Sequence, residues 1–284
     1  MKPVRGSFSL FARRIASEQE LAALFASPAL AEYRAYALEL FTRFARRAGF
    51  ARRPDLFLAE ELLGGAQVTL EGCVRGGVVE CLGLVDTGFH AGTTSFARFD
   101  YPSALPPAVQ ARMRALAAQL VPALGLDHTL FNLEFFFDAE RDRIGLIEVN
   151  PRLCGQFADL YAKVDGRGGY EVALALATGA EIPPRRTGAF PAAASVPLRT
   201  FRSVHVRRAP TRELLAEVER RHPGTLVFNE CASGQELVVQ PDVEDGCSVR
   251  YGILNLGAEH RCEVLEKSAR IERELDYELS PESR

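Results

Sequence analysis

The chain has 284 residues, of which 47% are hydrophobic and 25% are charged, and its net charge at pH 7 is −3. This composition is typical of a globular protein with room for one large domain or two smaller ones. The small net charge gives no basis for nucleic acid or an anionic membrane as partner. No apolar run approaches the ~20 residues of a membrane span, and residues 1–6 lack the apolar core of a signal peptide. We therefore expect a cytoplasmic protein.

Six cysteines are present, none in a C-x-x-C pair and none with a histidine at zinc-finger spacing. We expect free thiols in a reducing compartment. They are Cys73, Cys81, Cys154, Cys231, Cys247 and Cys262.

The N-terminal quarter predicts a strand over residues 7–15, followed by two helices. Ser17 and Glu20 have the spacing of a capping box, so the first helix begins there. The second helix is expected to end near Arg47. A short apolar strand is predicted over residues 56–63.

Two alternating segments, 67–75 and 78–85, are separated by Gly76-Gly77. This is a strong hairpin pattern, because a type I′ turn needs positive φ at both central residues. Residues 86–102 are polar and contain glycine, so they are interpreted as a long functional loop.

The following segments predict further elements by their periodicity. Helices are expected over 106–124 and about 168–178, with strands over 129–137 and 144–150 between them. Residues 181–192 are interpreted as a linker. Beyond the linker we expect a second α+β unit, with strands near 194–200, 225–230, 235–240 and 247–255 and helices near 211–221 and 264–276.

The two strands at 129–137 and 144–150 carry the most informative pattern. Side chains alternate between the faces of a strand, so Asn132 and Glu134 share one face, and so do Glu148 and Asn150. A hairpin centred on Arg141 places Glu134 opposite Glu148 and Asn132 opposite Asn150. Two carboxylates ~4–5 Å apart repel by about 3–4 kcal/mol at an effective dielectric of ~20, so a proton, an arginine or a cation must offset the repulsion.

An all-oxygen set of two carboxylates and an amide suits Mg²⁺ held together with substrate phosphates. The residues alone leave three alternatives open. The carboxylates could be a surface pair bridged by arginines, or an acid/base pair of the glycosidase type, or the register could be wrong.

The segment Glu148-Val149-Asn150-Pro151-Arg152, with Glu134 on the neighbouring strand, resembles the metal-site signature of ATP-grasp enzymes. The resemblance implies that Glu134, Glu148 and Asn150 hold Mg²⁺ or Mn²⁺. It also implies that Arg152 faces the transferring phosphoryl group or the substrate carboxylate.

Two further segments follow the order of this family. Lys2-Pro3, with Ser7 and Ser9 in the small-residue loop after it, resembles the segment that contacts the phosphates of ATP. Residues 60–67 resemble the hinge over the adenine. In that hinge, Glu60, Glu61, Leu62 and Leu63 are implied to read the base, and Gln67 stands where the family often has a glutamate on the ribose hydroxyls.

The resemblance implies an α+β, ATP-grasp architecture in three parts. Residues 1–66 are expected to form the smaller N-terminal subdomain, 67–182 the subdomain with the metal site, and 193–284 a C-terminal α+β subdomain. Such enzymes usually carry a further α/β domain in front, so the chain is expected to lack it or to obtain it from a partner chain. A homo-oligomer is also considered.

The expected function is an ATP- and Mg²⁺-dependent ligase that activates a carboxylate as an acyl phosphate and joins it to an amine. Within residues 86–102, Arg98 is a candidate for binding a substrate carboxylate. His90 is a candidate base, although an exposed loop histidine is the more ordinary interpretation. Two other functions are considered: an ATP-binding module or split-enzyme subunit without ligase activity of its own, and a hydrolase with a carboxylate pair and no nucleotide.

Overall fold

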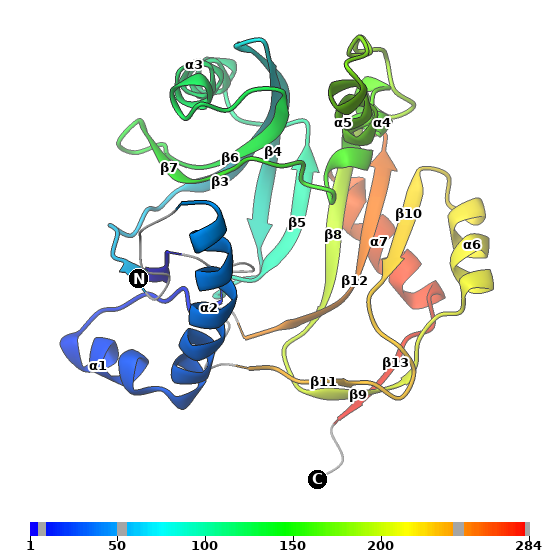
Figure 1. Cartoon of the computed structure of the whole chain (residues 1–284). Coiled ribbons are helices and arrows are strands. Elements are labelled where there is room, and N and C mark those ends of the chain that lie inside the picture. Colours follow the sequence, from blue (N-terminus) through cyan, green and yellow to red (C-terminus); the bar gives the residue numbers. More distant parts are fainter. Residues whose placement is uncertain (5–9, 50–55, 241–246, 282–284) are drawn as a thin grey trace.

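The computed structural model describes residues 1–4, 10–49, 56–240 and 247–281. Its main element is an eight-stranded sheet in the order β10–β12–β8–β5–β4–β3–β6–β7, in which all neighbours pair antiparallel (Figure 1). The strands are β3 (Ala66–Arg75), β4 (Val78–Phe89), β5 (Phe96–Tyr101), β6 (Thr129–Asp138), β7 (Arg143–Asn150), β8 (Ala192–Thr200), β10 (Thr225–Asn229) and β12 (Val249–Ala258). This mixture of helices with an antiparallel sheet confirms the predicted α+β class.

Helix α3 (Pro107–Ala123) covers one face of β3, β4 and β6. Its buried face, which includes Met113 and Val121, packs on Leu70, Leu84 and Leu133. The other face is partly covered by α4 (Ala158–Asp165) and α5 (Gly169–Thr178), which lie together at the upper end of the sheet in Figure 1. Among the described residues, α3 therefore closes one face of these strands, and no helix packs on the other face beside β7.

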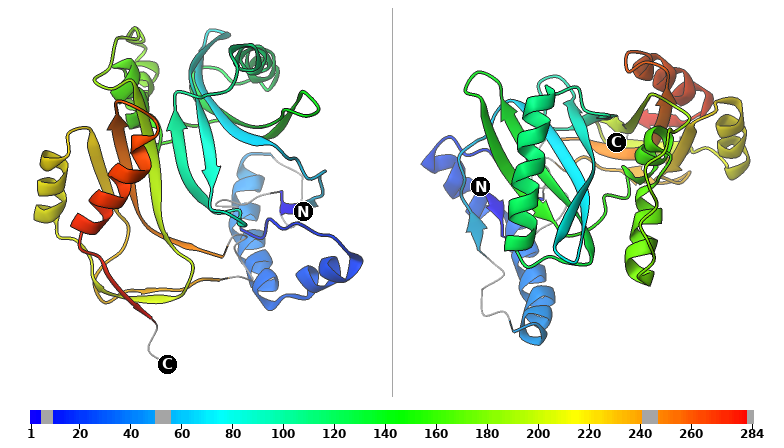
Figure 2. Two further views of the ribbon diagram at one scale, coloured as in Figure 1. Left: turned by 180° about the vertical axis from the view of Figure 1, so that it is seen from behind. Right: turned by 90° about the horizontal axis from the view of Figure 1, so that it is seen from above.

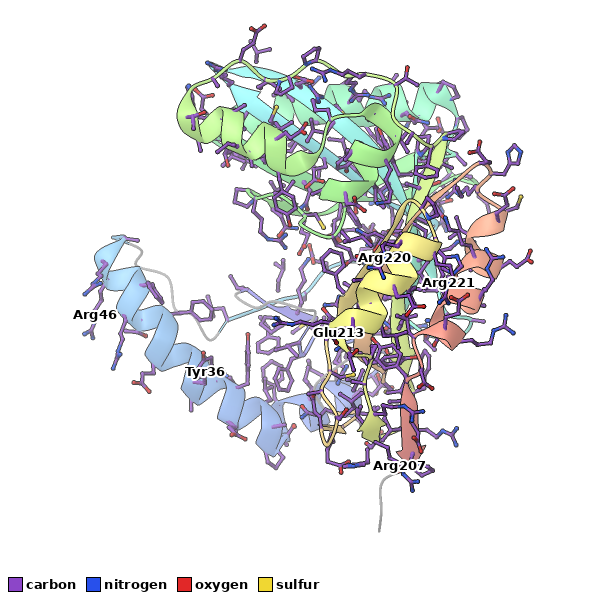
Figure 3. The ribbon with its side chains drawn as sticks, turned by 90° about the vertical axis from the view of Figure 1, so that its right-hand side faces the viewer. Tyr36, Arg46, Arg207, Glu213, Arg220 and Arg221 are labelled. Atoms are coloured by element: carbon purple, nitrogen blue, oxygen red, sulfur yellow. The ribbon has the colours of Figure 1, made fainter. Side chains whose placement is uncertain are left out.

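The N-terminal part forms a small unit of its own. Strands β1 (Lys2–Pro3) and β2 (Phe57–Leu58) pair with each other, and α1 (Glu18–Ala26) and α2 (Pro28–Arg47) follow β1. Ser17 accepts a hydrogen bond from the Glu20 N–H, as the capping pattern predicted, and both helices are confirmed. In Figure 3, α2 with Tyr36 and Arg46 extends away from the C-terminal elements.

Of the two strands predicted in this unit, the first is wrong over the described residues and the second is shorter than predicted. Residues 5–9 lie outside the described part, and residues 11–15 form no strand, because Phe11 turns the backbone (φ 55°) and buries its ring with Leu24 and Leu30. The strand predicted over 56–63 is limited to Phe57–Leu58. Beyond it, Glu60 and Glu61 use their carboxylates in ion pairs.

The hairpin at Gly76-Gly77 is confirmed, with φ of 57° and 76° at the two glycines. The loop predicted over residues 86–102 is limited to residues 90–95, because β4 continues to Phe89 and β5 spans Phe96–Tyr101. The charged residues of this segment form an ion pair within β5 and an arginine-mediated bridge between β4 and β5. Arg98 Nε lies 2.9 Å from Asp100 Oδ2, and an arginine from the C-terminal part, Arg261, bridges Asp86 and Asp100 at 2.7 and 3.1 Å.

The C-terminal residues extend the same sheet, since β8 pairs with β5 through Phe99 and Ser195. Helices α6 (Arg212–Arg221) and α7 (Glu263–Glu274) confirm the predicted helices, and both pack on this end of the sheet (Figure 2). Strands β11 (Glu236–Leu237), β9 (Val204–Arg208) and β13 (Glu278–Pro281) form a separate three-stranded sheet. The sequence patterns did not predict β1, α4, β5, β9 and β13. No helix in the described residues is long and apolar enough to cross a membrane.

Gly65, directly before β3, lies in close contact with the backbone of Phe137. Its φ is 107°, and a Cβ there would lie 2.1 Å from the Phe137 carbonyl oxygen, whereas a Cβ on Gly64 would meet no atom within 4 Å. We expect Gly65→Ala to lower the free energy of unfolding by about 2–4 kcal/mol, because it adds backbone strain and overlap. Gly64→Ala should change it by less than about 1 kcal/mol. Urea unfolding measures both, and equal effects would contradict the prediction.

Candidate functional site

The register of β6 and β7 brings the predicted acidic residues together. Glu134 pairs with Glu148 and Asn132 pairs with Asn150, as the sequence predicted. Beyond Glu134 the register shifts by one residue, because Phe135 pairs with Leu146. The extra residue, Ile147, forms a bulge, a feature often found beside active sites.

Strand β3 adds polar residues to the same face. Thr69 pairs with Glu134 and Glu71 pairs with Asn132, so these side chains lie in two cross-strand rows with those of β7. Thr69, Glu71 and Asn132 are all buried. The face opposite α3 therefore carries buried polar groups next to the carboxylate pair.

Electrostatics at the centre of these rows favour a cation. Burial and the neighbouring Glu148 carboxylate raise the pKa of Glu134 to about 7, although the charges of Arg152 and Lys2 act in the opposite direction. Gln67 Nε2 donates a hydrogen bond to Glu134 Oε2 at 3.2 Å. A divalent cation between the two carboxylates would favour the ionised form of both.

Asn150 lies at the edge of this carboxylate pair. Its Nδ2 donates to Glu148 Oε1 at 2.7 Å and to Asn132 Oδ1 at 3.0 Å, and its Oδ1 accepts from the Arg152 guanidinium at 3.5 Å. In the described part of the chain, no cluster of three or more His, Cys, Asp or Glu residues could hold a metal ion. The donor set of two carboxylates and one amide oxygen fits Mg²⁺ or Mn²⁺ whose remaining ligands come from phosphates or water.

Lys2 joins the N-terminal unit to the acidic strands. Its Nζ lies 2.7 Å from Glu60 Oε2 and donates to the Ile147 carbonyl oxygen, exposed by the bulge, at 3.2 Å. The lysine ammonium is therefore beside the carboxylate pair, on the open face of the sheet. Ser7 and Ser9, the other residues of the predicted phosphate loop, lie outside the described residues.

The predicted hinge lies against the β6–β7 hairpin. Glu61 forms a two-point ion pair with Arg143, with N–O distances of 3.1 and 2.9 Å. Leu63 fills the space above Gly145, where a Cβ would lie only 2.9 Å from its methyl carbons, while Leu62 is exposed. A small pocket opens here between the hinge and the hairpin, lined by residues that include Leu62, Leu63 and Phe136.

The structure does not bring Arg98 to the acidic pair. Cross-strand pairing and alternation put Arg98 on the α3 face with Asp86 and Asp100, opposite to Glu134. His90 lies between β4 and β5, and its ring meets Phe201 edge-on with a centroid distance of 5.0 Å. It is partly buried rather than exposed, and burial, with Arg199 nearby, lowers its pKa.

Sequence reasoning missed Glu71. Its carboxylate is fully buried and accepts a hydrogen bond from the Cys154 N–H, and burial raises its pKa to about 7. The signal was present in the alternation of Gln67, Thr69 and Glu71, which places all three on one face of β3. That alternation shows which face of β3 carries Glu71, but it does not show that the Cys154 N–H lies next to its carboxylate.

The raised pKa of Glu134 predicts how stability depends on pH without divalent cations. An unfolded glutamate titrates near pH 4.3, so between about pH 4.5 and 7 the folded chain binds more protons and stability falls as pH rises. Between pH 5 and pH 8 the free energy of unfolding of the wild-type chain should therefore fall, and Glu134→Gln should make this fall smaller by about 1–3 kcal/mol. Urea unfolding at both pH values measures this, with the exposed Glu140→Gln as control. Parallel pH profiles for Glu134→Gln and wild type would contradict the prediction.

No protein-family model and no curated protein matches the chain. Solved structures do match it in shape. An L-amino acid ligase from Bacillus licheniformis has 18% identity and a TM-score of 0.60, with 78% of this chain and 55% of that chain covered. A phosphoribosylglycinamide synthetase from Anaerococcus prevotii has 11% identity and a TM-score of 0.60, again with 78% of this chain and 55% of that chain covered.

A biotin carboxylase–β,γ-ATP complex from Campylobacter jejuni matches at 15% identity and a TM-score of 0.57, over 78% of this chain and 47% of that chain. The chain thus spans about half the length of these three proteins. Identities this low establish shape rather than activity. The chain has the ATP-grasp fold, as the resemblance of the acidic hairpin implied.

Proposed function

We propose that the chain is an ATP-dependent ligase that activates a carboxylate as an acyl phosphate and joins it to an amine. The observation that carries this proposal is the facing pair Glu134 and Glu148, with Asn150 and Lys2 beside it on the open face of the sheet. Two carboxylates in such a position suit a cation shared with phosphates.

In this proposal Glu134, Glu148 and Asn150 hold Mg²⁺ or Mn²⁺. The ion, when bound, neutralises charge on the phosphates. Lys2 exchanges its contact with Glu60 for a phosphate oxygen, which it reaches from the same position beside the bulge. Arg152, exposed at the end of β7, offers its guanidinium to the transferring phosphoryl group or to the substrate carboxylate.

The adenine is assigned to the hinge, where the backbone of residues 60–63 runs beside the hairpin and Leu63 supplies an apolar contact. Gln67 is assigned to the ribose, and Ser7 and Ser9 to the phosphate loop. Arg98 is not assigned to the substrate, because its ion pair with Asp100 lies on the other face.

A second candidate function is a nucleotide-binding subunit that acts with another chain. The observation that favours it is that the likeness to the L-amino acid ligase and to the phosphoribosylglycinamide synthetase is one of fold, at 18% and 11% identity, and a shared fold does not carry the ligase activity with it. The partner would be either a second copy or a chain that supplies a further domain. For either function, the proposed subdomains are residues 1–66, 67–182 and 193–284.

The first experiment measures thermal unfolding with ATP alone and with ATP and Mg²⁺. Binding at a ligand concentration of 100 times Kd stabilises a protein by about 2.7 kcal/mol, so we expect a rise in Tm that requires both. Glu148→Gln should weaken binding of the Mg²⁺ complex by about tenfold to hundredfold. Glu140→Gln, an exposed change in the same hairpin, should bind like wild type. Equal binding by Glu148→Gln and wild type would contradict the metal assignment.

The second experiment separates the two functions. Phosphate release is measured with panels of carboxylates and amines, and products are sought by mass spectrometry. Release that requires both substrates, with a condensed product, supports the ligase. Mg²⁺-dependent ATP binding without release supports the subunit, and no Mg²⁺-dependent binding contradicts both.

A further inference from the structure

We propose that Glu71 is a positioning residue for Arg152. Its buried carboxylate holds the backbone after β7 against the sheet, and this fixes where the Arg152 guanidinium stands relative to Glu148 and Asn150. The inference rests on the proposed function, because it assigns Arg152 to the phosphoryl group.

Two side chains on neighbouring strands hold the segment that carries Arg152. Glu71 on β3 accepts a hydrogen bond from the Cys154 N–H. Its cross-strand partner on β6, Asn132, donates from Nδ2 to the Arg152 carbonyl oxygen at 3.5 Å. The backbone on both sides of Leu153 is thereby tied to the row of residues next to the carboxylate pair.

Arg152 needs this support because its own side-chain contacts are weak. Its guanidinium donates to the Leu153 carbonyl oxygen at 3.4 Å and to Asn150 Oδ1 at 3.5 Å, and both oxygens are neutral. Distances this long are at the limit of hydrogen bonding. These contacts hold the side chain only weakly, so the position of its backbone sets the region that the guanidinium reaches, and the guanidinium stays available to an anion.

A carboxylate is a costly group to bury for packing alone, since an apolar side chain of similar volume would fill the space without a desolvation penalty. Glu71 is 0% exposed and packs under the segment after β7. Burial raises the pKa of Glu71 to about 7, while the Cys154 N–H, the Tyr161 hydroxyl and the charge of Arg152 act in the opposite direction. Among the described residues, the Cys154 N–H donates to one carboxyl oxygen, Oε1, and the other oxygen has no hydrogen-bond partner. The contact to Cys154 is therefore the interaction that ties this buried carboxyl to the segment after β7.

The test compares two conservative variants of the full chain. Glu71→Gln keeps an oxygen at the same reach without the charge, whereas Glu71→Asp keeps the charge but is shorter by one carbon–carbon bond, ~1.5 Å. Hydrogen exchange of the peptide over residues 151–157 reports the contact at Cys154. Binding of the Mg²⁺ complexes of ADP and of a non-hydrolysable ATP analogue reports the position of Arg152.

We expect Glu71→Asp to exchange about tenfold faster at Cys154 and to bind the ATP analogue about tenfold more weakly, with ADP binding unchanged, since a small displacement of an anion contact has such effects. Arg152→Ala should show the same loss for the analogue. Glu71→Gln should stay within about twofold of wild type in both measurements. Thr225→Val, which removes a buried hydroxyl in β10 at the far edge of the sheet, should leave both unchanged.

Three outcomes would overturn the inference. Both Glu71 variants could bind like wild type, or Glu71→Gln alone could lose the analogue, which would indicate charge rather than reach. Either variant could also lose ADP and analogue alike, which would indicate a general structural role. Failure of the proposed function is distinguishable, because it would appear in the wild-type chain as absence of Mg²⁺-dependent binding.

Discussion

The repulsion between two carboxylates on adjacent strands is the constraint around which this site is organised. Side by side on β6 and β7, Glu134 and Glu148 would repel by about 3–4 kcal/mol at an effective dielectric of ~20. The chain offsets this only in part, through a hydrogen bond from Gln67 and the charges of Lys2 and Arg152. A cation bound between the two carboxylates would offset the remaining repulsion.

The position of the pair follows from the packing on the other face. Leu133 and Phe135 are fully buried in the core under α3, and alternation then directs Glu134 to the opposite side. Helices α4 and α5 cover that side only over part of the sheet. The hydrophobic core thus decides which side chains point to the other face, and the register of one hairpin sets two acidic residues opposite each other.

The contacts between the N-terminal unit and the hairpin are of a different kind. Lys2 and Glu61 reach the hairpin through polar contacts whose side chains are 30% and 66% exposed. Exposed ion pairs are each worth only about 0–1 kcal/mol. Such contacts are readily exchanged for contacts to a ligand, whereas the buried hydrogen bond of Glu71 to Cys154 belongs to the permanent framework.

Local sequence patterns determined the hairpins, most helices and the register that joins Glu134 to Glu148, because periodicity and turn chemistry act over a few residues. They did not determine that β8 pairs with β5, since pairing between distant strands depends on the whole core. The polar strand at Arg98 is interpreted as a loop for the same reason. Its charges are balanced by Asp100 and by the distant Arg261, and the sequence pattern does not show that pairing. Glu71 was visible as an alternating polar residue, but only the tertiary structure placed Cys154 above it, because that contact spans 83 residues of chain.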